Sequence, residues 1–143
     1  MSNLILISIK SKYVDQILSG HKTIELRKAM PKATKGDMII IYTTKPVMAV
    51  TAIAIVGNII NCTPAEMWRD YKNKIGVDKK SFNEYYKTAT KAIGIELENV
   101  FKLDAEILLS AIKLINPQFS PPQTFKYLNK FTTLREYKSL RNN

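Results

Sequence analysis

The chain alternates between apolar runs of the kind that form strands and amphipathic stretches of the kind that form helices. Apolar runs bounded by turn residues predict strands at residues 4–9, 22–29, 37–43, 47–60, 89–97 and 107–115. Helical spacing and start signals predict helices at 12–19, 64–74 and about 79–87, and a further helix starting at 120. This mixture of elements is typical of an α+β protein.

The predicted strand at 47–60 indicates the shape of the sheet. Both of its faces are apolar, and one of them carries the small residues Ala52 and Ala54. Small residues on a buried strand are expected where a sheet curls around a small barrel, and Gly57 can supply the bend. We therefore expect a small mixed β-barrel of five to six strands with flanking helices.

Length and hydropathy favour one compact domain. The 143 residues are 45% hydrophobic, which is enough for a single core. We expect one domain over residues 1–143, with 129–143 as a C-terminal basic helical extension. The apolar stretch 47–60 is too short for a membrane helix, and 4–9 is too short for the core of a signal peptide. A cytoplasmic protein that does not bind a membrane is expected.

Cysteine and histidine, which commonly bind zinc, are scarce in this chain. The chain has a single cysteine, Cys62, and a single histidine, His21. One cysteine excludes an internal disulfide, and the pair is too small a set for a zinc site. We expect no metal site and no cofactor.

The charge of the chain favours a polyanionic partner. It has 22 basic and 12 acidic side chains and a formal charge of +10. The excess is spread evenly, because residues 1–62 hold 8 basic and 3 acidic groups and residues 63–143 hold 14 and 9. Such a charge attracts phosphate backbones, although it also serves simply to keep a protein soluble.

The richest chemistry lies in residues 20–27, which form a turn and the start of a predicted strand. Side chains of a strand alternate between its faces, so Ile24 and Leu26 point one way while Thr23, Glu25 and Arg27 point the other. The polar face is either part of a binding site or an ordinary solvated charge pair.

The segment 120–123 also admits two interpretations. Ser120 and Gln123 have the spacing of a capping box, so the segment can simply start a helix. Pro121 and Pro122 have no N–H groups and make a poor phosphate site. Their alternative use is as a rigid wall, beside which the amide of Gln123 reads the edge of a base.

Several of these segments together resemble the ASCH domain family, small relatives of the PUA-like RNA-binding barrels. The central match is the signature Lys22-Thr23-Ile24-Glu25-Leu26-Arg27. The other matching segments are 7–13, 17–20, 36–37, 64–68 and 121–125, and the last of these, with its Pro-Pro-Gln sequence, is similar to a subgroup of predicted regulators. The resemblance implies a PUA-like fold.

For function, the family and the charge lead us to expect a nucleic-acid-binding module. Its basic cleft would take single-stranded RNA, or a flipped or modified base, between the Pro-Pro-Gln segment and the strand of Glu25. A regulator of this kind would also need a protein partner. The expected nucleic-acid-binding residues are Lys10, Lys12, Lys22, Thr23, Glu25, Arg27, Tyr42 and Gln123.

The alternative is a small hydrolase that uses the same cleft, because proteins similar to this family include ribonucleases and amidohydrolases of modified pyrimidine nucleosides. Its catalytic residues would be Lys22, Glu25 and Tyr42. The amidohydrolase relatives carry a hydroxyl three residues after the lysine, where this chain has Glu25. Thr23 cannot replace that hydroxyl simply, because adjacent strand residues face opposite sides.

Overall fold

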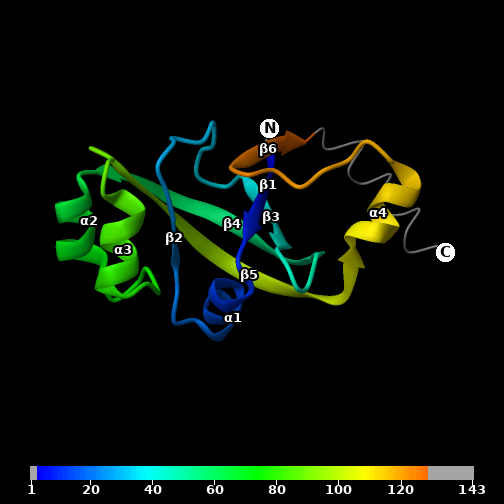
Figure 1. The fold of residues 1–143 in the computed structure, drawn as a ribbon, viewed down its shortest axis with the longest axis horizontal. Helices are drawn as coiled ribbons and strands as arrows, with labels where there is room; N and C mark the ends of the chain where they lie inside the picture. The colour runs from blue at the N-terminus through cyan, green and yellow to red at the C-terminus, as the bar shows by residue number, and fades with distance from the viewer. Residues whose placement is uncertain (1–2, 129–143) are drawn as a thin grey trace.

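The computed structural model describes residues 3–128, and its centre is a curled, six-stranded mixed sheet that forms a half-barrel (Figure 1). The strand order is β2-β5-β4-β3-β1-β6. β1 and β3 are parallel, and all other neighbours are antiparallel. The strands are β1 (Leu4–Ile9), β2 (Ile24–Arg27), β3 (Met38–Thr43), β4 (Ala49–Cys62), β5 (Ala92–Leu108) and β6 (Phe125–Leu128). The predicted α+β class and strand number are confirmed.

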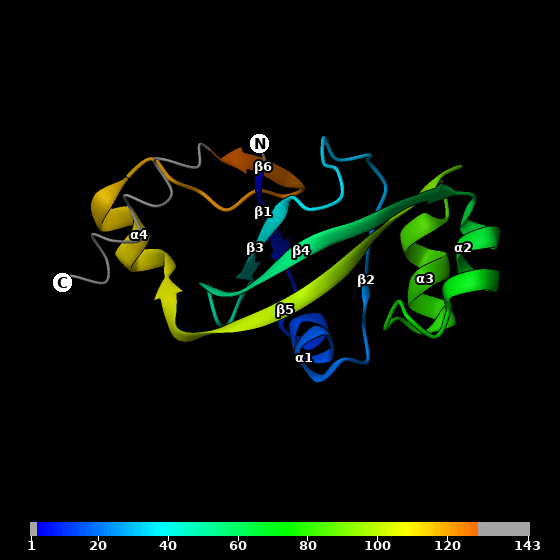
Figure 2. The same cartoon turned by 180° about the vertical axis from the view of Figure 1, so that it is seen from behind.

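Four helices surround this sheet in the described part of the chain. They are α1 (Ser11–Ser19), α2 (Pro64–Tyr71), α3 (Lys79–Tyr86) and α4 (Leu109–Ile115). The views from the two sides show α2 and α3 next to each other at one end of the sheet and α4 at the opposite end (Figures 1 and 2). None of the helices in residues 3–128 is long and apolar enough to cross a membrane. The predicted basic extension, 129–143, lies outside the described residues.

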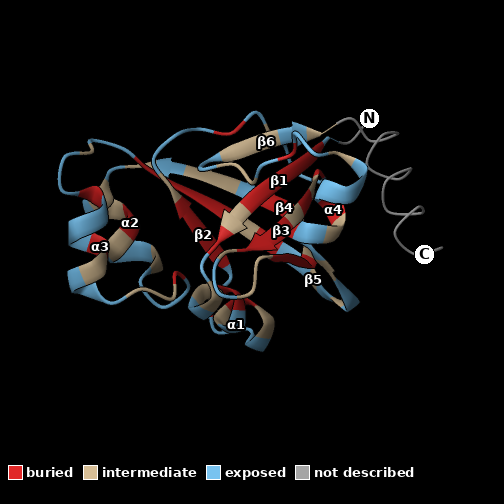
Figure 3. Cartoon of the chain, turned by 45° about the vertical axis from the view of Figure 1, so that its right-hand side comes forward, coloured by how far each residue is buried: buried red, intermediate tan, exposed pale blue. Residues whose placement is uncertain are grey.

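Three apolar clusters hold the elements together, and the buried positions concentrate on the strands (Figure 3). The largest cluster fills the curl of the sheet with isoleucines of β1, β3 and β5. A second cluster joins β2 to α2 and α3 through Ile24, Met67 and Phe82. A third packs α4 against β1, β3 and β4. Because each buried aliphatic or aromatic side chain contributes about 1.5–3 kcal/mol, the second cluster fixes β2 firmly against the two helices.

The bend expected in β4 is present. The pairing of β4 with β5 shifts register three times, and the last shift lies between Val56 and Ile59, around Gly57. A Cβ on Gly57 would lie 2.7 Å from Oε1 of Glu98 and 3.1 Å from Cβ of Glu96, so a larger residue there would displace side chains of β5.

The prediction of separate strands at 89–97 and 107–115 was wrong. The structure has one long strand, β5, followed by the helix α4. Residues 98–106, which belong to neither predicted strand, form a largely exposed ribbon paired with β4. In the segment 109–115 the buried residues Leu109 and Ile112 lie three apart, which is helical rather than strand spacing.

The helix predicted to start at 120 is absent from the described residues. Residues 120–124 are irregular and lead into β6, which pairs antiparallel with β1. A residue that precedes proline disfavours the helical conformation. Since both Ser120 and Pro121 precede a proline, the start signal at 120–123 is overridden and the chain stays extended.

Candidate functional site

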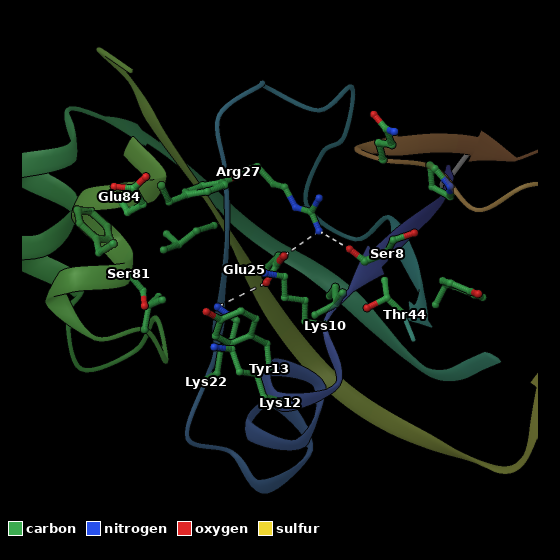
Figure 4. A pocket seen from close by; sticks show the side chains of 18 of the residues that line it. Ser8, Lys10, Lys12, Tyr13, Lys22, Glu25, Arg27, Thr44, Ser81 and Glu84 are labelled. Carbon is green, nitrogen blue, oxygen red and sulfur yellow. Dashed lines mark hydrogen bonds and ion pairs between the residues drawn. The ribbon is translucent and has the colours of Figure 1, made fainter. Parts of the chain in front are cut away.

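A cleft of about 960 Å³ lies between the half-barrel and α3 (Figure 4). Its walls come from the end of β1 and the start of α1, from β2, from the residues after Gly76 together with α3, and from the proline segment. The lining residues are Ser8, Ile9, Lys10, Lys12, Tyr13, Lys22, Glu25, Leu26, Arg27, Tyr42, Thr44, Val77, Lys80, Ser81, Phe82, Glu84, Tyr85, Pro121, Pro122 and Gln123. A cavity of this size accommodates a nucleotide.

Strand alternation places the charged side chains in this cleft. Ile24 and Leu26 enter the cluster under α2 and α3, while Glu25 and Arg27 line the cleft, as the alternation predicted. Leu26 also borders the cleft. The close packing of β2 also depends on Gly94 of β5. A Cβ there would lie 2.9 Å from Cγ2 of Ile24, so any larger residue would push β2 away.

Lys22, Glu25 and Arg27 form a connected row of charges, which we call the charged row (Figure 4). Nζ of Lys22 lies 3.5 Å from Oε1 of Glu25, and Nη2 of Arg27 lies 2.8 Å from Oε2 of the same carboxylate. All three side chains are largely buried. Two cations around one anion leave the row with a positive charge, which favours an acceptor or an anion beside it.

Lys22 is held by backbone carbonyls as well as by Glu25. Its Nζ donates to the carbonyl oxygens of Ile24 at 2.7 Å and Ile75 at 2.6 Å. An ammonium group has three hydrogens, and these two carbonyls and the carboxylate supply three acceptors. Burial lowers the pKa of Lys22, and the neighbouring Glu25 opposes that effect. The ammonium therefore faces the protein and fixes Glu25.

Gly76 allows the loop after α2 to close over Lys22. It has a φ of +64°, and a Cβ at this position would collide with Oε1 of Gln16 and lie 2.9 Å from Cβ of Lys22. A residue with a side chain would be strained in this conformation and would also displace Lys22. The position of the Ile75 carbonyl thus depends on the glycine that follows it.

Arg27 connects β2 to β1 through a single nitrogen. Both hydrogen bonds of its guanidinium in the described residues involve Nη2, which donates to Oε2 of Glu25 and to the carbonyl of Ser8, each at 2.8 Å. The ring of Phe125 lies beside the guanidinium, with its centre 5.6 Å from Cζ. Nε of Arg27 and Oγ of Ser8 are buried and have no hydrogen-bond partner among residues 3–128.

Exposed cations stand at the rim of the cleft. Lys10 and Lys12 flank the start of α1, and Lys80 lies in the first turn of α3. Nζ of Lys12 sits 4.9 Å from the centre of the Tyr13 ring. The cleft therefore combines mobile surface charges at its edge with a fixed charged row inside.

The wall formed by α3 was not predicted from the sequence. Ser81, Phe82, Glu84 and Tyr85 line the cleft, and Tyr85 is 38% exposed. Phe82, Tyr85 and Tyr86 recur at helical spacing, and this aromatic pattern was the signal available in the sequence. Phe82 and Tyr86 are buried against β2, which turns Tyr85 toward the cleft.

Seven of the eight residues predicted for nucleic-acid binding come together here: Lys10, Lys12, Lys22, Glu25, Arg27, Tyr42 and Gln123. Thr23 does not line the cleft; it is exposed, and its amide donates to the carbonyl of Lys74.

Tyr42 is only 4% exposed, and burial raises the pKa of its hydroxyl. In the described part of the chain, no three His, Cys, Asp or Glu side chains are arranged to share a metal ion.

Comparison with known proteins agrees with this fold. The model of the ASCH domain matches residues 7–103, so the chain belongs to the ASCH domain family. A relative from Zymomonas mobilis, named an ASCH domain-containing ribonuclease, is 28% identical over 127 residues, which are 89% of this chain and 85% of the relative.

Solved structures resemble the whole fold. The crystal structure of ASCH from Zymomonas mobilis has a TM-score of 0.87 at 28% identity and covers 96% of this chain and 94% of its own. A hypothetical protein from Leishmania major has a TM-score of 0.60 at 10% identity, over 99% of this chain and 96% of its own. At that identity the second likeness concerns the fold alone.

Proposed function

We propose that the cleft binds single-stranded RNA, with phosphates at the lysine rim and a base beside the charged row. The observation that carries this proposal is the arrangement of charge: exposed Lys10, Lys12 and Lys80 surround a pocket whose interior holds a buried carboxylate and guanidinium. Exposed lysines attract phosphates without regard to sequence, whereas fixed polar groups in a pocket recognise base edges.

Two further observations support an RNA ligand. The formal charge of +10 favours a polyanion over a neutral metabolite. The relative from Zymomonas mobilis is named a ribonuclease, and this chain shares its domain over most of both lengths. A regulatory role would require a protein partner in addition to the RNA.

Within this function Lys22 is a positioning residue. Its ammonium hydrogens are directed at the carbonyls of Ile24 and Ile75 and at Glu25. It therefore acts on the ligand through the carboxylate that it holds. Contacts to phosphate fall to the rim lysines, and contacts to the base fall to Glu25, Arg27 and Gln123.

Binding can be tested by fluorescence anisotropy with a short, unstructured RNA over a series of salt concentrations. Each neutralised phosphate should add about −0.7 to the slope of log affinity against log salt concentration. Lys10→Ala and Lys12→Ala should each weaken binding and flatten the slope. Lys113→Ala, an exposed lysine on α4 outside the cleft, is the matched control and should change neither. A slope near zero for the unaltered protein contradicts RNA binding.

Cleavage of the bound RNA is a second candidate, and the ribonuclease name of the relative favours it. In such a reaction the 2′-oxygen attacks phosphorus and the bond to the 5′-oxygen breaks, so one group must remove a proton and another must donate one. Tyr42 lines the cleft and is the candidate proton donor, because its hydroxyl is protonated at neutral pH, although burial raises its pKa and so makes it a weaker acid. The positive charge of the charged row would stabilise the phosphorane.

The two candidates and the amidohydrolase alternative are separated by product analysis. The protein is incubated with short RNA and, separately, with N-acylated pyrimidine nucleosides, and the products are resolved by chromatography. RNA fragments ending in a cyclic phosphate indicate a ribonuclease, and a released acyl group indicates an amidohydrolase. Salt-dependent binding without either product indicates a binding module.

A further inference from the structure

The carboxylate of Glu25 is placed to accept hydrogen bonds from a ligand. It lines the cleft although its side chain is only 9% exposed. A carboxylate offers about four lone-pair sites, and Lys22 and Arg27 each approach one oxygen. Each oxygen therefore keeps one acceptor site.

Arg27 supplies unused donors next to this carboxylate. Its hydrogen bonds in the described residues engage Nη2 alone, and its guanidinium carries five N–H hydrogens. Nε is buried without a partner, as is Oγ of Ser8, so the donors left for a ligand are those of Nη1. Glu25 and Arg27 form the part of the cleft that we call the floor. The floor thus presents the two acceptor oxygens of Glu25 with the guanidinium donor of Arg27 beside them.

From this pattern we infer that the cleft recognises guanine, an inference that rests on the proposed RNA binding. The Watson–Crick edge of guanine carries two adjacent donors, N1–H and the N2 amino group, followed by the acceptor O6. The two donors match the oxygens of Glu25, and O6 matches Arg27. A bidentate pairing of this kind is among the most discriminating contacts to a base.

The other bases fit this floor poorly. Adenine and cytosine each place a ring-nitrogen acceptor beside their amino group, and that lone pair would face a carboxylate oxygen. Uracil offers one N–H between two carbonyl oxygens, which leaves half of the carboxylate unpaired. Mismatches are costly here because the groups are buried, and a buried polar group left without a partner loses its full hydration energy.

The charged row keeps Glu25 ready for this task. Lys22 and Arg27 hold its two oxygens from opposite sides, so the carboxylate does not need to reorient when the base arrives. Aromatic side chains of Tyr13 and Tyr85 line the same cleft and provide faces against which a base can stack. A carboxylate that is already held in position favours discrimination between bases.

The test uses uridine-rich RNAs of one length that differ at a single central base. Their affinities are measured by competition against a labelled RNA at fixed salt concentration. Guanine in the centre should bind about tenfold or more tightly than adenine, cytosine or uracil. Inosine, which lacks the N2 amino group, should be intermediate. 7-Deazaguanine keeps the Watson–Crick edge and should equal guanine.

Variants of the protein test whether Glu25 causes the preference for guanine. Glu25→Gln replaces one acceptor with a donor and should abolish the guanine preference while the salt dependence of RNA binding remains. Glu106→Gln, an exposed carboxylate on β5 outside the cleft, makes the same charge change and should keep the preference. If Glu25→Gln fails to fold, the series of central bases measured with the unaltered protein decides the matter.

The outcomes distinguish this inference from the proposed function. Salt-dependent binding that is equal for all central bases, or that favours a base other than guanine, overturns guanine recognition and leaves RNA binding intact. A guanine preference that 7-deazaguanine loses also overturns it, because the other edge of the base is then recognised. Failure to bind any of the RNAs overturns both.

Discussion

The ammonium of Lys22 lies 2.6 Å from the carbonyl oxygen of Ile75, a residue 53 positions further along the chain. This contact joins the turn before β2 to the loop that leads to α3, and both segments border the cleft. The same ammonium holds Glu25. The shape of the cleft and the orientation of its carboxylate are thus linked through one side chain.

We expect Lys22→Ala to destabilise the fold by about 3 kcal/mol, because it leaves the buried carbonyls and Glu25 without their shared donor. Urea denaturation followed by circular dichroism measures the change. Lys28→Ala, which removes an exposed lysine just after β2, should cost less than about 0.5 kcal/mol. Equal stabilities of the two variants would mean that Lys22 does not hold the walls together.

We expect Gly76→Ala to be more destabilising than Gly36→Ala. Both glycines have positive φ, so alanine is strained at either position. At Gly36 the space around a Cβ is open, whereas at Gly76 it would collide with Gln16 and press on Lys22. Strain alone costs about 1 kcal/mol, and the collision should add at least as much. Thermal melts of both variants give the comparison, and similar melting temperatures would contradict it.

Asp37 should make the stability of the fold depend on acid pH. Burial tends to raise the pKa of this carboxyl, but hydrogen bonds from the amides of Asn3 and Thr34 outweigh it and the pKa lies below 3.8. A carboxyl with a lowered folded-state pKa stabilises the protein above its ordinary pKa, and that contribution is lost as the pH falls through the folded-state value.

The expected result is a steeper loss of unfolding free energy from about pH 5 to about pH 2 in the unaltered protein than in Asp37→Asn. Urea titrations at several pH values measure this difference. Asp104→Asn, which changes an exposed carboxyl of β5, serves as the control and should keep the steep dependence. Parallel pH profiles for the unaltered protein and Asp37→Asn would contradict the prediction.

Tyr42→Phe separates cleavage from binding. The hydroxyl makes no hydrogen bond within residues 3–128, so its removal should change stability by less than about 1 kcal/mol. If the hydroxyl donates a proton during cleavage, the rate should fall about 100-fold or more while RNA affinity stays the same. Single-turnover cleavage and anisotropy on the same RNA give the two values. Unchanged cleavage would remove Tyr42 from the reaction.

The local pattern of β2 predicted the charged side chains that reach the cleft. Alternation separated Glu25 and Arg27 from Ile24 and Leu26, and the structure agrees except that Leu26 also borders the cleft. The partner of Lys22 was beyond such reasoning, because Ile75 contributes a backbone carbonyl and its side chain gives no indication of that contact. Such a contact depends on how the folded chain brings distant residues together, and the local sequence does not show this.

The predictions for two other segments failed for a related reason. The sequence of 107–115 is apolar enough for a strand, and only the packing of Leu109 and Ile112 against the third cluster distinguishes it as a helix. At 120–123 two opposing local signals compete, and the conformational restriction before proline prevailed over the capping pattern. The α3 wall was missed because helical spacing alone does not show that Phe82 and Tyr86 enter the core while Tyr85 lines the cleft.

β6 joins the last described residues to the first ones, since Leu128 pairs with Leu4 and Phe125 pairs with Ile7. The proline segment that walls the cleft immediately precedes this strand, and Ser8, which also lines the cleft, immediately follows the paired part of β1. A chain still being synthesised cannot form this pairing until residue 128 has left the ribosome. Unfinished chains therefore lack the wall of the cleft that the proline segment supplies.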